Sequence, residues 1–68
     1  MAKLICEAVI DDADTMRHVK NQLRFAKAKV TSFDNHIRAV IETDDNKQIR
    51  NVRNMFQKLD NHLIRMVR

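Results

Sequence analysis

The sequence predicts an α+β fold in the order β-α-β-β-α, with both helices on one face of a three-stranded antiparallel sheet and a long C-terminal helix. Three observations predict it. Apolar and polar residues alternate in three short segments, apolar residues recur at helical spacing in two longer ones, and an Asp-Asn dipeptide separates two of the alternating segments. The chain has 68 residues, so we expect residues 1–68 to form a single domain.

The first strand is expected over Lys3–Ile10 and the first helix over Ala13–Phe25. Apolar residues occupy both faces of the strand, so neither face should be wholly exposed to water. Three carboxylates at the start of the helix suit an N-cap and the helix dipole: Asp11, Asp12 and Asp14. A metal site is the alternative interpretation, but no glycine-bearing calcium loop follows them.

An antiparallel hairpin is expected next. Its strands are Ala28–Phe33 and His36–Thr43, and the turn between them is Asp34-Asn35. Aspartate and asparagine tolerate the left-handed backbone region better than other residues except glycine, which makes this dipeptide a turn signal.

The second helix is expected from Asn46 to near the C-terminus, after Asp44 and Asp45. Six apolar residues spaced three and four apart form a seam along it: Ile49, Val52, Phe56, Leu59, Leu63 and Met66. At 1.5 Å per residue this helix is about 34 Å long, more than three short strands cover. Its far end, residues 63–67, is therefore expected to project or to contact another chain.

Oligomerisation is the expected source of extra stability. A chain of this size buries only about 60% of its unfolded surface, and the single cysteine, Cys6, excludes an intrachain disulfide. We expect a dimer that pairs through its sheets, either with itself or with a paralogous subunit. The residues expected at this interface are Leu4, Cys6, Ala8 and Ile10.

A groove that receives another protein's helices is the second expected surface. Its residues would be Met16, Val19, Leu23, Ile49, Val52, Phe56, Leu59 and Leu63. The alternative is that such residues cover the domain's own core. Within the seam we prefer the core role for residues 49–59 and a partner contact for residues 63–67.

The sequence excludes several kinds of chemistry. It has no glycine, so it has no glycine-rich phosphate loop. Neither Cys6 nor any of the three histidines, His18, His36 and His62, has a second ligand at metal-binding spacing. We therefore expect no enzyme activity, no cofactor, no metal and no small-molecule substrate. The lone cysteine and the lack of a membrane-spanning apolar run favour a cytoplasmic protein without a membrane partner.

The positive charge lies in the C-terminal third. The net charge is +4, and residues 46–68 carry six basic residues against one acidic residue. A basic segment favours acidic partners such as nucleic acid, although a solvated helix face is the simpler interpretation. With no exposed aromatic residues expected beside them, phosphate contacts by Arg53, Arg65 and Arg68 are the predicted mode of RNA binding.

The second helix resembles the terminal helix of the small dimerisation subunit of the KEOPS complex. The residues that match by identity or close similarity are Asp45, Ile49, Arg50, Asn54, Phe56 and Lys58. The element order and the length match over the whole chain. Met55 and Leu59 depart from the family's usual serine and tryptophan, and the hairpin turn lacks its usual glycine, as a divergent paralogue would.

The resemblance implies a non-catalytic subunit in the threonylcarbamoyl-adenosine modification of tRNA. It would dimerise, pack on the helices of a separate catalytic subunit and contribute basic surface to tRNA binding. A stand-alone small dimeric nucleic-acid-binding module is the alternative. A third hypothesis, a regulatory domain that binds a metabolite between paired sheets, has the missing glycine loop and the small volume against it.

Overall fold

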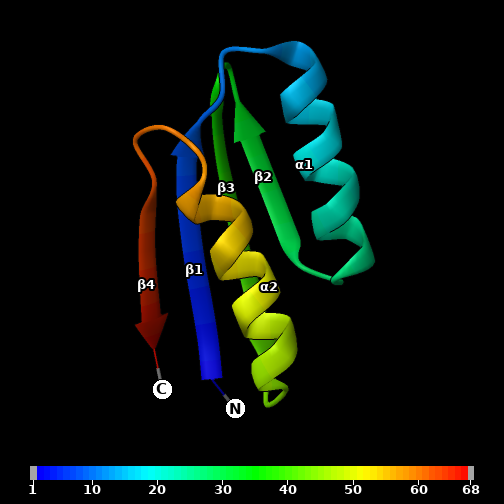
Figure 1. The fold of residues 1–68 in the computed structure, drawn as a ribbon, viewed down its shortest axis with the longest axis vertical. Coiled ribbons are helices and arrows are strands. Elements are labelled where there is room, and N and C mark those ends of the chain that lie inside the picture. The colour runs from blue at the N-terminus through cyan, green and yellow to red at the C-terminus, as the bar shows by residue number, and fades with distance from the viewer. Residues whose placement is uncertain (1, 68) are drawn as a thin grey trace.

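A computed structural model describes residues 2–67 as six elements in one four-stranded antiparallel sheet with two helices (Figure 1). The elements are β1 (Ala2–Val9), α1 (Ala13–Phe25), β2 (Lys29–Phe33), β3 (His36–Thr43), α2 (Asn46–Gln57) and β4 (Leu63–Val67). The strand order is β2-β3-β1-β4. This β-α-β-β-α-β arrangement is the ferredoxin-like, or split β-α-β, topology.

The α+β class, the antiparallel sheet and the placement of both helices on one face are as the sequence predicts. The predictions of a three-stranded sheet and of a long C-terminal helix are wrong. Helix α2 ends at Gln57, and the chain turns at Asn61, whose φ is 52°, before β4 pairs with β1. Ile64 therefore lies opposite Cys6 on the inner face, whereas Arg65 lies opposite Ile5 on the outer face.

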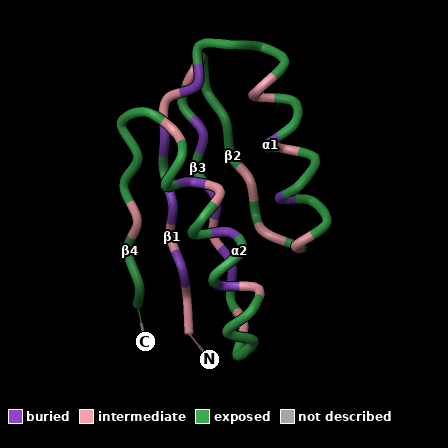
Figure 2. The backbone as a smooth tube through the Cα atoms, in the orientation of Figure 1, coloured by how far each residue is buried: buried purple, intermediate pink, exposed green. Residues whose placement is uncertain are grey.

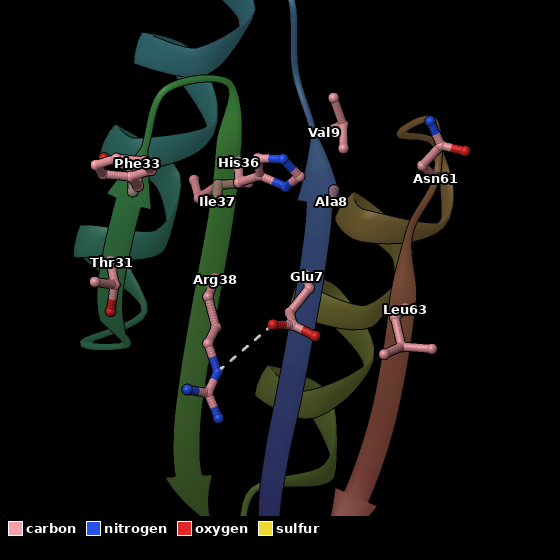
Figure 3. A pocket seen from close by; sticks show the side chains of 11 residues that line it. Glu7, Ala8, Val9, Thr31, Phe33, His36, Ile37, Arg38, Asn61 and Leu63 are labelled. Carbon is pink, nitrogen blue, oxygen red and sulfur yellow. Dashed lines mark ion pairs between the residues drawn. The ribbon is translucent and has the colours of Figure 1, made fainter.

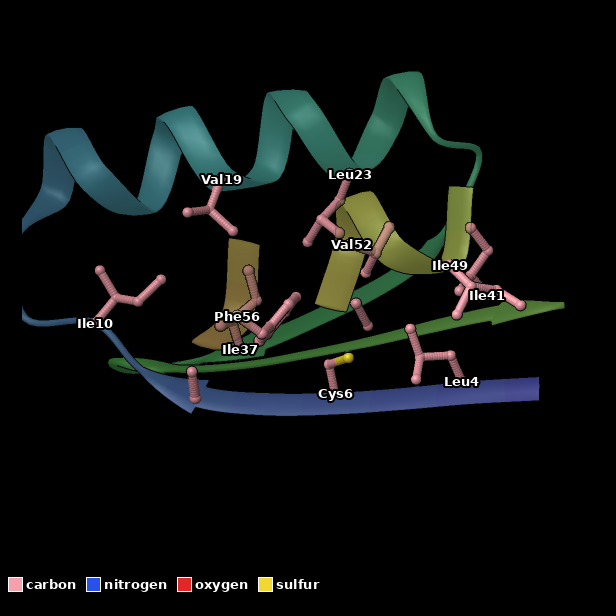
Figure 4. Packing of buried hydrophobic residues seen from close by; sticks show 12 residues of the cluster. Leu4, Cys6, Ile10, Val19, Leu23, Ile37, Ile41, Ile49, Val52 and Phe56 are labelled. Atoms are coloured by element: carbon pink, nitrogen blue, oxygen red, sulfur yellow. The ribbon is translucent and has the colours of Figure 1, made fainter. Parts of the chain in front are cut away.

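The core lies between the inner face of the sheet and the two helices (Figure 4). Buried residues alternate along β1 and β3, and they recur at helical spacing in α1 and α2 (Figure 2). Phe56 and Leu23 are completely buried at the centre. The full set is Leu4, Cys6, Ala8, Ile10, Val19, Leu23, Ile37, Ala39, Ile41, Ile49, Val52 and Phe56.

Both helices have an aspartate as their N-cap residue. The Asp12 carboxylate accepts hydrogen bonds from the Thr15 backbone N–H at 3.1 Å and from the Thr15 hydroxyl at 2.6 Å. These two bonds stabilise the ionised form, so they lower the pKa of Asp12 below its usual 3.8. Asp45 caps α2 by accepting from the Lys47 N–H at 3.0 Å.

Helix α1 ends in a Schellman motif. The Ala28 N–H donates to the Leu23 carbonyl and the Lys27 N–H to the Arg24 carbonyl, while Lys27 takes the left-handed conformation at φ 60°. In the described part of the chain, neither helix is long and apolar enough to cross a membrane.

Candidate interaction surface on the open face of the sheet

The outer face of the sheet is the surface that no described helix covers. Figure 3 looks onto this face, with both helices behind the sheet. Residues paired directly across antiparallel strands point to the same side. The strand pairing therefore places Ile5 beside Val40, and Val9 beside His36, on this outer face.

Apolar side chains lie across much of this face. Ile5, Val9 and Val40 are only half-buried, although they lie on the two central strands. On the edge strands, Phe33 is 77% exposed and Leu63 is 56% exposed. A face of this kind, rich in apolar groups and open to water, is typical of an interaction site.

The same face carries two ion pairs on either side of the Ile5–Val40 pair. Arg38 Nε lies 3.9 Å from Glu7 Oε1, and Lys3 Nζ lies 3.4 Å from Glu42 Oε1. All four side chains are about half exposed. Pairs with this exposure stabilise an isolated chain by only about 0–1 kcal/mol each.

A shallow hollow lies at one end of this face (Figure 3). Its volume is about 460 Å³, and Thr31, Phe33, His36, Arg38 and Leu63 are among the residues that line it. No group of three or more His, Cys, Asp or Glu residues among those described is placed to hold a metal ion. The lining of the hollow includes the exposed apolar side chains of Phe33 and Leu63.

Three of the residues predicted for the sheet interface lie on the other face of β1, and the fourth, Ile10, follows directly after the strand. Leu4, Cys6, Ala8 and Ile10 are each 6% exposed or less, because they pack beneath the helices. The sequence could not decide between the two faces, since β1 is a central strand with apolar residues on both. The outer-face residues that sequence reasoning missed, Lys3, Glu7, Arg38 and Glu42, show a signal only once the strand register is known. Each strand carries a basic residue followed four positions later by an acidic one, and because the strands are antiparallel, opposite charges face each other.

Burial also makes Cys6 unreactive. Its side chain is completely enclosed. Burial raises the pKa of the thiol from 9.0 to about 11, and the positive charge of Arg53 acts in the opposite direction. A thiol with so high a pKa is almost entirely protonated at neutral pH, so it is a poor nucleophile.

The predicted partner-helix groove is largely this chain's own core. Val19, Leu23, Ile49, Val52 and Phe56 are buried, and Met16 and Leu59 pack half-buried against them. Leu63 lies on the opposite side of the sheet, because β4 replaces the predicted helix end.

A groove of about 1050 Å³ does lie between α1 and α2. Val19, Val52 and Leu59 line it among polar residues such as Asn21 and Asn51. Three of the eight residues predicted for a partner groove therefore border a real groove.

The three arginines predicted to contact RNA do not form one surface. Arg53 is exposed on α2, on the helix side, whereas Arg65 points to the outer face of the sheet. Arg68 lies outside the described residues.

Three of the six residues that match the KEOPS small subunit have structural roles in this fold. Asp45 caps α2, Ile49 and Phe56 are in the core, and Arg50, Asn54 and Lys58 are exposed. A capped helix that packs one face against a sheet needs a similar pattern whatever the protein does.

Comparison with solved structures finds the same fold in an uncharacterized protein, TM1266 from Thermotoga maritima. The superposition has a TM-score of 0.60 at 20% sequence identity, and it covers 97% of this chain and 92% of that one. No protein-family model matches the sequence, and no curated protein matches it. At this identity the likeness supports the four-stranded fold, β4 included.

Proposed function

We propose that this protein is a non-catalytic assembly module that self-associates through the open face of its sheet. The observation that carries the proposal is the apolar content of that face: Ile5, Val9 and Val40 at its centre, with Phe33 and Leu63 at its edges. Pairing two such faces removes these side chains from water, at roughly 25 cal/mol per Å² of apolar surface.

The non-catalytic part of the proposal rests on the nature of the sites. The hollow on the outer face is shallow, and the one thiol is enclosed and protonated at neutral pH. Active sites need reactive groups that converge in a pocket able to enclose a substrate.

Sedimentation equilibrium at micromolar concentration tests the proposal. We expect the wild-type chain to form a dimer and Val40→Asp to be a folded monomer, because an aspartate at the centre of the interface would be buried without a partner. Asn51→Asp, an exposed change on α2, is the matched control and should remain dimeric. A wild-type protein that sediments as an 8.0 kDa monomer would contradict the proposal.

A second function, RNA binding by the helix layer, is favoured by the distribution of charge. Helices α1 and α2 together carry six basic residues and one acidic residue, Asp14. In the tRNA-modification role implied by the KEOPS resemblance, this layer would contact tRNA, and the groove between the helices would receive the catalytic subunit. Co-purification with a KEOPS catalytic subunit tests that narrower role.

A further inference from the structure

Four charged residues form a rectangle around the Ile5–Val40 pair, which we call the central pair. Two lie on β1 and two on β3, and positive and negative charges alternate around the rectangle. The four residues of this charge rectangle are Lys3, Glu7, Arg38 and Glu42. Along each strand its members are four residues apart, or about 14 Å, and across the strands they are about 4.8 Å apart.

This pattern is complementary to itself. A two-fold axis that runs parallel to the strands, between β1 and β3, brings Arg38 opposite Glu7 of a second copy and Lys3 opposite Glu42. A two-fold axis perpendicular to the strands, through the central pair, brings Arg38 opposite Glu42 and Lys3 opposite Glu7. In both cases each of these four charges meets its opposite, whereas sheets crossing near 90° lose these pairings.

We propose that the occupant of the open face is a second copy of this chain, packed with its strands aligned about a two-fold axis at the central pair. The inference rests on the proposed function and adds the partner's identity and its orientation. An interface about a two-fold axis buries the same patch on both subunits, so that patch must complement itself. Aligned packing is one of the two common arrangements of stacked sheets.

The charges give specificity, and the apolar groups give attraction. In the isolated chain each ion pair is about half exposed and weak. In the dimer each charge would gain a second opposite charge while the central pair is removed from water. Lys29 and Arg65 are on the edge strands β2 and β4, where their long side chains reach water at the periphery.

Three sets of variants test this arrangement by sedimentation equilibrium and native mass spectrometry of isotope-labelled mixtures. The inverted variant (Lys3→Glu, Glu7→Lys, Arg38→Glu, Glu42→Lys) keeps both ion pairs within the chain and remains self-complementary. We expect it to dimerise like the wild type but to form few mixed dimers with it. An acidic variant (Lys3→Glu, Arg38→Glu) and a basic variant (Glu7→Lys, Glu42→Lys) should each dimerise more than about tenfold less tightly than the wild type, and should form a heterodimer when mixed.

A swap of one pair (Lys3→Glu, Glu42→Lys) distinguishes the two axes. It retains an ion pair at the same place within the chain, so the stability of the isolated fold should not change. Dimerisation survives if the axis is parallel to the strands, because each positive charge still faces a negative one. It is lost if the axis is perpendicular to them, because like charges then meet.

The outcomes separate this inference from the proposed function. A monomeric wild type refutes the proposed function and the inference with it. A dimeric wild type whose inverted variant mixes with it statistically refutes only the inference, as do acidic and basic variants that each dimerise like the wild type. If the acidic or basic variant fails to fold, the inverted variant still decides the question, because it keeps both ion pairs of the chain.

Discussion

Lys27 has a backbone conformation that is unfavourable for its residue type. It occupies the left-handed position after α1, at φ 60°, where glycine is usual. A residue with a Cβ is strained in this conformation. Asparagine or aspartate at this position could offset the strain with a local hydrogen bond from its side chain, but lysine cannot. The chain has no glycine at all, so the same geometry falls on Asp34 and Asn61 in its other two tight turns.

We expect Lys27→Gly to stabilise the protein by about 1 kcal/mol, because it relieves the strain and keeps the Schellman hydrogen bonds. Urea denaturation followed by circular dichroism measures the change. Lys27→Ala, which removes the charge but retains the Cβ, is the control and should give no such gain. Equal stability of the two variants would contradict the interpretation.

Cys6 makes the stability depend on pH in the alkaline range. The folded thiol has a pKa of about 11, whereas the unfolded thiol ionises near its ordinary 9.0. Between these values the unfolded state has lost a proton that the folded state keeps. The free energy of unfolding therefore falls as pH rises from about 9 to about 11.

We expect the urea midpoint of the wild type to fall more steeply across this range than that of Cys6→Ala. The comparison of slopes cancels the titration of the lysines, which both proteins share, and the constant cost of the smaller side chain. The native thiol should also resist a thiol reagent at neutral pH until denaturant unfolds the chain. Equal slopes, or rapid labelling of the native protein, would show that Cys6 is accessible.

At the scale of elements, β4 shows where sequence reasoning succeeds and where it fails. The first strand, the first helix and the hairpin lie within about a residue of their predicted bounds. In these segments the hydrophobic periodicity and the turn residues indicate the same boundaries. The prediction failed for residues 59–66 because their apolar spacing continues the helical seam. The signal was present in Asp60-Asn61, which repeats the Asp34-Asn35 turn and, like it, contains a left-handed residue. Placing both helices on one side predicts an uncovered sheet face, but the residues on that face could not be predicted, since they depend on β1 having neighbours on both sides.

Neighbouring residues of β4 lie on opposite faces of the sheet, so we expect their substitution to change the stability by different amounts. Ile64 packs half-buried against the core, so Ile64→Asp should destabilise the chain by about 1–2 kcal/mol. Arg65→Asp, one residue along but on the outer face, should change the stability of the isolated fold by less than about 0.5 kcal/mol. Thermal denaturation at low protein concentration measures both without a contribution from dimerisation. Similar losses in the two variants would argue against a strand here.

At the scale of the whole molecule, the helix layer and the outer face of the sheet differ in their balance of charge and apolar surface. Helices α1 and α2 carry six basic residues against one acidic residue, whereas the sheet face combines apolar groups with paired charges. A dimer paired through its sheets therefore presents two basic helix layers outward, on opposite sides. Such a dimer could hold a polyanion without disturbing its own interface.

RNA binding through this layer should depend on the neutralisation of phosphates. We expect Arg50→Ala with Arg53→Ala to weaken tRNA binding. The dependence of affinity on salt should also become weaker. With a single-stranded RNA as the ligand, the magnitude of the slope of log affinity against log salt concentration should be smaller than that of the wild type by about 0.7 for each phosphate that the double variant no longer neutralises. Arg65→Ala, on the other face, is the matched control. A salt titration that shows the same slope for all three proteins would leave these arginines as solvated surface.

The pairing of β1 with β4 has a consequence for the order of folding. These strands come from opposite ends of the described chain, and Cys6 meets Ile64 across them. While the chain emerges from the ribosome, β1 can pair with β3, but its other edge stays open until β4 is made. An unpaired central strand with apolar residues on both sides is a template for aggregation. Chains interrupted before residue 63 should therefore collect in insoluble form, even though most of their core residues are already present.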